Sequence, residues 1–269
     1  MPHTLQPLSL GKLLDETFDI YRRNILLFLG ISAIPNIALL VLQIVLSGSS
    51  LTNPNAPRMA TVSVSLIMWL ASLFVSSIVT AATTLAVSDI YLDTPTSVAA
   101  CFARVAGKAL RVCYVSFVVS LIVALGTLLC IVPGVYLAGF YGVAIPAVVL
   151  EKTGGNASLR RSSTLTSDFV GRVIVVYFLT TIFIFGMTWA LTAGADALGS
   201  IAFHDTGIFT KQMFETIAST LGGVLFGPIT AIGLTLVYYD LRVRKEAFDI
   251  EHMMRLMVPE NEASGASAS

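Results

Sequence analysis

The sequence predicts an all-α membrane protein that crosses the bilayer six times and carries three amphipathic helices at the cytosolic interface. Composition is the first observation behind this fold class. Charged residues make up only 12% of the 269 residues and hydrophobic residues 55%, with a mean hydropathy of +0.84. A soluble chain usually carries about 25% charged residues. The formal net charge is +0, so no overall basic field attracts nucleic acid, and we expect no nucleic-acid partner.

Five stretches without Asp, Glu, Lys or Arg are the second observation. They cover residues 24–57, 59–88, 112–150, 173–195 and 216–239. A spanning helix needs about 20 apolar residues, because the hydrocarbon core is about 30 Å thick, so the third stretch is long enough for two helices. Its Pro133 and Gly134 are typical of a tight turn and predict a helical hairpin. The six predicted spans are 25–46, 62–88, 112–132, 135–150, 173–195 and 216–239.

The distribution of Lys and Arg is the third observation. Of the sixteen basic residues, all except Arg58 and Lys211 fall on one side of the predicted spans. Cytosolic segments carry an excess of Lys and Arg, so both termini are predicted to be cytosolic. Residues 1–255 then form a single integral membrane domain. Residues 256–269 are mostly small and polar and predict a disordered cytosolic tail.

Each outward-going span follows a cytosolic segment with an apolar face and basic residues, which is typical of helices that lie in the membrane interface. A segment and two spans would form a unit used three times, over 8–91, 96–151 and 157–242. Ser9, Ser97 and Ser158 align, and each is followed fourteen positions later by an Arg. An acid ends each return helix, and we expect it to meet that Arg at the inner interface. The predicted pairs are Arg23 with Asp89, Arg111 with Glu151, and Arg172 with Asp240.

Two interpretations of this alignment stay open. Parallel repeats pack around an axis along the membrane normal. Alternatively, interfacial helices attract Arg and helix ends attract charge in any membrane protein. In either case the basic segments should prefer anionic lipids, at about 1 kcal/mol per cation near the surface. We expect Arg160 and Arg161 in the third segment to bind lipid headgroups. Protein partners and the oligomeric state, including a homo-oligomer, stay open.

Catalytic patterns are missing from the sequence. It contains no H-E-x-x-H, no Walker loop and no G-x-S-x-G, and the three histidines are isolated. We therefore expect no enzyme activity, no metal and no cofactor. A stripe of hydroxyl residues on the second span either lines a polar pathway or bonds to its own helix and its neighbours. The stripe consists of Ser65, Ser72, Ser76, Thr80 and Thr83.

Three parts of the chain resemble bacterial proteins with the membrane domain of glycerophosphoryl diester phosphodiesterase. They are residues 9–24, residues 131–136 with 146–151 and 159–162, and the ending at 238–249. The resemblance implies a stand-alone module of the bacterial cytoplasmic membrane. Some relatives join this module to a soluble catalytic barrel, whose His, Glu and metal-binding acids have no counterpart here, so we expect no phosphodiesterase activity.

The sequence favours a non-enzymatic integral membrane protein that organises or handles lipids or a membrane partner. The alternative is a small-molecule transporter or channel, for which the hydroxyl stripe is the main argument. A transporter should contain a polar cavity that reaches mid-membrane depth, whereas a scaffold should be packed shut.

Overall fold

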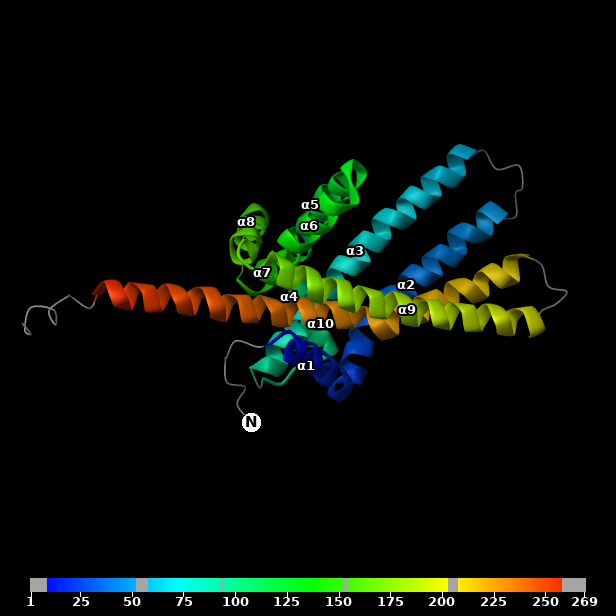
Figure 1. Ribbon diagram of the computed structural model, residues 1–269. Helices are drawn as coiled ribbons and strands as arrows, with labels where there is room; N and C mark the ends of the chain where they lie inside the picture. Colours follow the sequence, from blue (N-terminus) through cyan, green and yellow to red (C-terminus); the bar gives the residue numbers. More distant parts are fainter. Residues whose placement is uncertain (1–8, 52–57, 93, 152–153, 203–207, 258–269) are drawn as a thin grey trace, which may run out of the picture.

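The computed structural model describes residues 9–51, 58–92, 94–151, 154–202 and 208–257. Within these ranges the chain forms ten α-helices and no strand (Figure 1). The helices are α1 (Leu10–Arg23), α2 (Ile25–Leu51), α3 (Arg58–Tyr91), α4 (Val98–Ala106), α5 (Ala109–Leu129), α6 (Ile131–Tyr141), α7 (Ala144–Leu150), α8 (Gly155–Thr166), α9 (Val170–Ala202) and α10 (Ile208–Met257).

Six segments are long and apolar enough to cross a bilayer. They are Ile25–Leu46, Val62–Tyr91, Ala109–Leu129, Ile131–Leu150, Val170–Gly199 and Met213–Glu246. The predicted all-α, multi-pass membrane fold is therefore confirmed. The predicted tail begins two residues too early, because α10 continues to Met257; the remainder of that tail lies outside the described residues.

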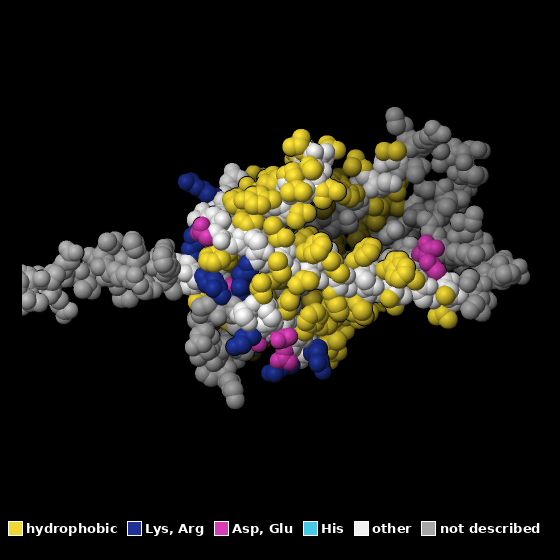
Figure 2. All heavy atoms as spheres, viewed as in Figure 1, with side chains coloured by type: hydrophobic (Ala, Val, Ile, Leu, Met, Phe, Trp, Pro, Cys, Tyr) yellow, Lys and Arg dark blue, Asp and Glu magenta, His cyan; other side chains and the backbone are white. Residues whose placement is uncertain are grey.

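The helices follow one order three times: a short helix, a helix leading away from it, and a return. The groups are α1–α2–α3, α4–α5–α6/α7 and α8–α9–α10. We call the end of the bundle that carries α1, α4 and α8 the charged end, because Lys and Arg side chains gather there (Figure 2). The opposite end is the far end. This order is that of the predicted unit, while the repeat in sequence stays a prediction.

The starts of the three short helices correct the alignment of the serines. Ser9 and Ser97 are the N-caps of α1 and α4, and their hydroxyls accept the backbone N–H three residues later. The N-cap of α8 is Gly154. Ser158 lies one turn inside α8, where its hydroxyl donates to the carbonyl of Gly155 at 2.7 Å. By helix start, Gly154 rather than Ser158 is therefore the counterpart of Ser97.

The α5–α6 hairpin turns at Cys130, and the predicted turn at Pro133 and Gly134 is wrong. Cys130 has extended angles (φ −170°, ψ 152°) and separates Leu129 from Ile131. Pro133 and Gly134 belong to the first turn of α6, where a proline is tolerated because the N–H it lacks would have no partner within the helix. Gly134 serves close packing instead, since a Cβ there would overlap Thr127 of α5.

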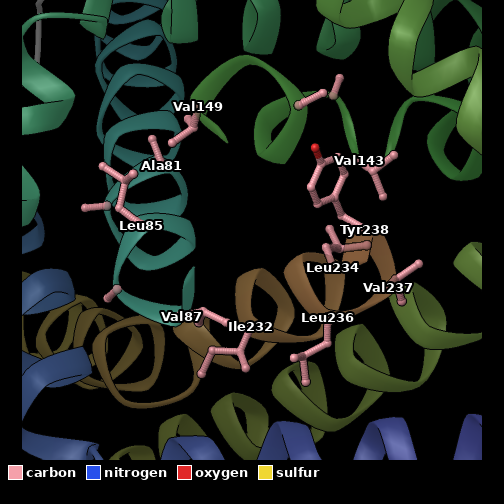
Figure 3. Packing of buried hydrophobic residues seen from close by; sticks show 14 of the residues in the cluster. Ala81, Leu85, Val87, Val143, Val149, Ile232, Leu234, Leu236, Val237 and Tyr238 are labelled. Atoms are coloured by element: carbon pink, nitrogen blue, oxygen red, sulfur yellow. The ribbon is translucent and has the colours of Figure 1, made fainter. Parts of the chain in front are cut away.

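Helix α10 is the centre of the core. Almost every residue from 228 to 241 is buried, which is typical of a helix surrounded on all sides. In Figure 3 its side chain Ile232 lies beside Val87 of α3, and both belong to the same buried cluster as Leu85 and Val149. Two polar contacts add to this packing: the Ser32 hydroxyl of α2 donates to the Val224 carbonyl at 2.7 Å, and the Tyr21 hydroxyl of α1 donates to that of Leu225.

The bundle is tight at the charged end and open toward the far end. Gly139, in the last turn of α6, and Gly142, its C-cap, bring the end of α6 close to α9. A Cβ at Gly139 would meet Ile174, and one at Gly142 would meet Val173, both in the first turns of α9. Beyond this contact the α5–α6 hairpin diverges from α9 and α10 (Figure 1). Large apolar side chains cover the outer surfaces of the spans (Figure 2), as expected of helices in contact with lipid.

Candidate functional site

Two features of the bundle are candidate sites. One is a set of ion pairs at the charged end, and the other is a cavity deeper in the bundle. The first ion pair joins Asp89 near the end of α3 to Arg104 of α4. Both terminal nitrogens of the guanidinium contact the carboxylate, one of them at 3.1 Å. The hydrogen bond to Asp89 raises the pKa of Arg104, so the pair stays ionised.

Glu151, the C-cap of α7, is the centre of the second cluster. Its two carboxylate oxygens accept from Nε of Arg161 at 2.9 and 3.0 Å, and the Tyr238 hydroxyl donates to one of them at 2.7 Å. Arg161 also contacts Glu246 of α10, which pairs with Arg242 on the same helix at 2.7 Å. Burial lowers the pKa of Arg161, but hydrogen bonds to the two carboxylates outweigh it, and the net shift is upward.

The third cluster confirms one predicted pair. Nε of Arg172 lies 2.9 Å from Oδ2 of Asp240, whose side chain is fully buried. This contact is an ion pair without an aligned hydrogen bond from Nε. Arg244 approaches the same oxygen at 3.0 Å. A buried carboxylate needs such compensation, because leaving it unpaired would cost several kcal/mol.

The other two predicted pairs are wrong. Arg23 is the last residue of α1, where it pairs with Asp19 at 2.7 Å and is largely exposed. Arg111 is exposed and forms no ion pair with any described residue. Their expected partners, Asp89 and Glu151, are bound by the short helix of the following group instead.

A spacing that the sequence analysis missed identifies the true partners. Arg104 and Arg161 each stand seven residues after the N-cap of their helix, Ser97 and Gly154. Seven residues are close to two helical turns, so the arginine takes the same position on both helices. In α1 the equivalent position, seven after Ser9, is occupied by Glu16. The alignment on Ser158 displaced the third segment by one turn and hid this match.

The two expected headgroup ligands differ in the structure. Arg160 is exposed and forms no ion pair among the described residues, so it is available to a lipid phosphate. Arg161 is occupied by two carboxylates. Arg161 therefore holds α7, α8 and α10 together, although the sequence predicted that it would bind lipid headgroups as Arg160 does.

The cavity has a volume of about 380 Å³ and lies between α3, α5, α6, α7, α9 and α10. No charged side chain among the described residues lines it. The lining hydroxyl residues are Ser76, Ser77, Thr80, Ser116, Ser120, Tyr141, Tyr177 and Thr230. Thr230 precedes Asp240 by ten residues, which is about 15 Å along a helix and half of a hydrocarbon core about 30 Å thick. The cavity therefore reaches mid-membrane depth.

Most of the lining hydroxyls lack a partner in the protein. Several Ser and Thr elsewhere in the spans donate hydrogen bonds to carbonyls three or four residues back, as in Ser32, Thr180 and Thr235. Thr83 and Thr188, which do not line the cavity, are buried hydroxyls without a partner among the described residues. Seven hydroxyls at the cavity make no hydrogen bond to any described residue: those of Ser76, Thr80, Ser116, Ser120, Tyr141, Tyr177 and Thr230. The Ser116 oxygen is fully enclosed and still has no partner.

Members of the predicted hydroxyl stripe on α3 take both of the roles considered for it, and Thr83 takes neither, since it does not line the cavity and its buried hydroxyl has no partner among the described residues. Ser76 and Thr80 line the cavity, whereas Ser72 donates to the Trp69 carbonyl at 2.7 Å. The facing hydroxyls of Ser116 and Ser120 on α5 were not predicted from the sequence. Their four-residue spacing, equal to that of Ser76 and Thr80, was the available signal.

Comparison of the chain with protein-family models, curated proteins and solved structures finds no match. Among the described residues, no three His, Cys, Asp or Glu side chains are grouped as they would be to hold a metal ion. The candidate site therefore rests on the cavity and the ion pairs alone.

Proposed function

We propose that this chain is a non-enzymatic protein of the bacterial cytoplasmic membrane that handles lipids by binding the polar part of an amphiphile in the cavity. The single observation that carries this proposal is the group of seven hydroxyls without a protein partner at mid-membrane depth. A hydroxyl left unpaired in an apolar environment costs about 1–3 kcal/mol. A ligand with several hydrogen-bonding oxygens would satisfy many of these groups at once.

The chemistry of the lining narrows the class of ligand. Because the described lining of the cavity contains no charged side chain, an isolated ion would lose its hydration without gaining a counter-charge. Hydroxyl and ester oxygens fit the lining better, and both occur in the glycerol portion of membrane lipids. A volume of about 380 Å³ lies within the range of small-ligand sites, which suits the polar part of a lipid whose chains stay in the bilayer.

The proposal also gives the charged end an orientation and a role. The excess of Lys and Arg supports a cytosolic charged end, with both termini on that side. Arg22, Arg111 and Arg160 are exposed there and form no ion pair with described residues. They would hold anionic headgroups at the surface, while the cavity binds below them. The resemblance to the phosphodiesterase membrane domain supports the bacterial assignment.

Two glycines of α10 provide a matched test. A Cβ at Gly227 would meet nothing within 4 Å, and this residue lines the cavity. A Cβ at Gly223, one turn away, would also meet nothing within 4 Å, but that residue does not line the cavity. Leucine at position 227 should thus occupy the cavity without displacing the backbone, and leucine at position 223 should face open space.

The experiment measures lipid retained after purification, by native mass spectrometry in phosphatidylglycerol and phosphatidylethanolamine mixtures. Blocking three or more hydrogen bonds at about 0.5–1.5 kcal/mol each should lower retention about tenfold or more in Gly227→Leu. Gly223→Leu should retain lipid as the wild type does. Equal retention in both variants, with both proteins folded and monodisperse, would refute the cavity as the binding site.

A transporter for small uncharged molecules is the second candidate, and the mid-membrane depth of the cavity favours it. Proteoliposomes containing the wild type should then take up an uncharged polyol such as mannitol faster than empty vesicles. The Gly227→Leu variant should abolish that difference. Lipid retention without polyol flux would leave lipid handling as the function.

A further inference from the structure

A narrow apolar fissure adjoins the cavity on the side between α3 and α5. It has a volume of about 140 Å³ and shares Leu73, Ser77 and Ser116 with the cavity. Its remaining lining is apolar or weakly polar: Leu70, Phe74, Cys113 and Phe117. Three of these side chains, Leu70, Phe74 and Phe117, are 44–51% exposed on the outer surface. The fissure therefore joins the hydroxyl-lined cavity to the face of the bundle that contacts lipid.

We infer that the amphiphile bound in the cavity enters and leaves sideways through this fissure, with its hydrocarbon chains held between α3 and α5. This inference rests on the proposed function, because it names the route to the same site. The lining changes from apolar at the surface to hydroxyl-rich inside, which is the order of groups in a lipid that enters with its polar part first. A polar route from the charged end would need a polar lining there.

Ser77 and Ser116 mark the junction of the two spaces. The Ser77 hydroxyl shares its one donor hydrogen between the carbonyls of Leu73 and Phe74, so that donor is used. The Ser116 hydroxyl faces it from α5, enclosed and without a partner. An amphiphile that separates α3 from α5 as it passes through the fissure would expose the Ser116 hydroxyl as an unused hydrogen-bonding group. The Ser116→Ala variant should therefore bind more weakly, with no change in the width of the fissure.

An engineered disulfide can close the fissure. One of its two cysteines, Cys113, is already present in the native sequence. The Ser77 oxygen lies 3.8 Å from Sγ of Cys113, so the Ser77→Cys substitution places a second thiol beside Cys113 on the facing helix. The two sulfur atoms must still approach to about 2.05 Å for the bond to form. Oxidation with copper phenanthroline would then lock α3 to α5. The Cys130→Ser background prevents links between molecules, because Cys130 is exposed. Adding Cys113→Ala gives a matched variant that cannot form the bond.

Exchange of bound lipid measures the route directly. Protein loaded with phosphatidylglycerol is mixed with vesicles of deuterated phosphatidylglycerol, and the two bound forms are followed by native mass spectrometry. If the fissure is the route, oxidation should slow the exchange of bound lipid about tenfold or more. The disulfide closes the fissure through which lipid passes and leaves the binding cavity unchanged. Reduction should restore the rate, and the amount of preloaded lipid should stay the same throughout.

The two proposals fail in different ways. Unchanged exchange in protein shown to be crosslinked overturns the lateral route, whereas the leucine variants of Gly227 and Gly223 decide the cavity separately. A second pair of variants decides the route if the disulfide does not form. Phe117→Ala widens the fissure and should speed exchange, while Phe178→Ala removes an exposed ring of α9 away from it and should not. Equal rates in this pair overturn the inference.

Discussion

Replacing Gly134 with alanine tests the close approach of α5 and α6. A Cβ on residue 134 would lie 2.8 Å from the Cα of Thr127, whereas non-bonded carbon atoms prefer about 3.5–4.0 Å. Because that nearest carbon belongs to the backbone, a change of rotamer cannot remove the overlap, and the two helices must move apart. Overpacking of this kind costs about 1–3 kcal/mol, and we expect Gly134→Ala to lower the stability by that amount.

Gly186 provides the matched control within a spanning helix. A Cβ there would meet nothing within 4 Å, and alanine is preferred over glycine in a helix by up to about 1 kcal/mol. The Gly186→Ala variant should therefore be as stable as the wild type or more so. Both are compared by the midpoint of thermal unfolding in detergent, followed by tryptophan fluorescence. A Gly134→Ala variant that unfolds at the same temperature as Gly186→Ala would refute the close contact at Thr127.

Three further predictions follow from the charges. A reporter fused after Ser50 should be external, because the charged end is proposed to be cytosolic; a cytosolic signal would contradict the six-span topology. Arg161→Gln should lose roughly 1–3 kcal/mol, because Glu151 and Glu246 lose the guanidinium they share and keep only Tyr238 and Arg242. The exposed Arg160→Gln should change stability by less than about 0.5 kcal/mol; equal thermal midpoints would contradict the assignment. A hydrogen bond from Lys245 and its positive charge lower the pKa of Asp168 below 3.8. The pair therefore stabilises the fold at neutral pH. This stabilisation is lost as the pH falls through the lowered pKa, because the carboxylate becomes protonated. The difference in midpoint between wild type and Asp168→Asn should therefore vanish in acid, and a difference that grows there would show the sign to be wrong.

The six spans could be predicted because bilayer thickness acts on each helix separately. A run of residues without charge either reaches across the hydrocarbon core or does not, and neighbouring helices do not enter the argument. The span predicted at 62–88 is found at Val62–Tyr91, and the one predicted at 173–195 is found at Val170–Gly199. The errors are confined to the ends, where charged residues can continue a helix into the headgroup region.

The position of the hairpin turn was predicted wrongly because proline and glycine each suit two different local structures. Pro133 suits a turn and also suits the first turn of a helix. Gly134 suits a positive φ and also suits close contact between helices. The structure takes the second outcome for both, and only the contact with Thr127 distinguishes them. Such a contact depends on the pairing of α5 with α6, which no local pattern encodes.

The cavity could be anticipated only in part. A stripe of hydroxyls is visible on one helix, but a cavity needs several helices to present hydroxyls at the same depth. Ser76 and Thr80 on α3 face Ser116 and Ser120 on α5 across the space, and Thr230 of α10 completes it. Their depths can be counted from the charged end, yet the side of each helix that faces inward follows from packing. The cavity therefore cannot be predicted without knowing how the spans pack against one another.

The ion pairs explain how three similar groups close into one bundle. The return helix of each group packs on the short helix of the next: α3 on α4, α7 on α8, and α10 on α1. At the first two junctions an acid of the return helix binds an arginine seven residues past the N-cap, as Asp89 binds Arg104 and Glu151 binds Arg161. At the third, the position in α1 holds an acid, Glu16.

Asp240, the acid of the third junction, is buried and needs a compensating charge, which the acid in α1 does not supply. It is compensated from its own group, by Arg172 and Arg244. The junction of α1 with α10 relies instead on buried apolar side chains such as Leu13, and on the hydrogen bond from the Tyr21 hydroxyl to the Leu225 carbonyl. The one predicted pair that the structure confirms, Arg172 with Asp240, therefore exists because closure breaks the pattern that the other two groups share.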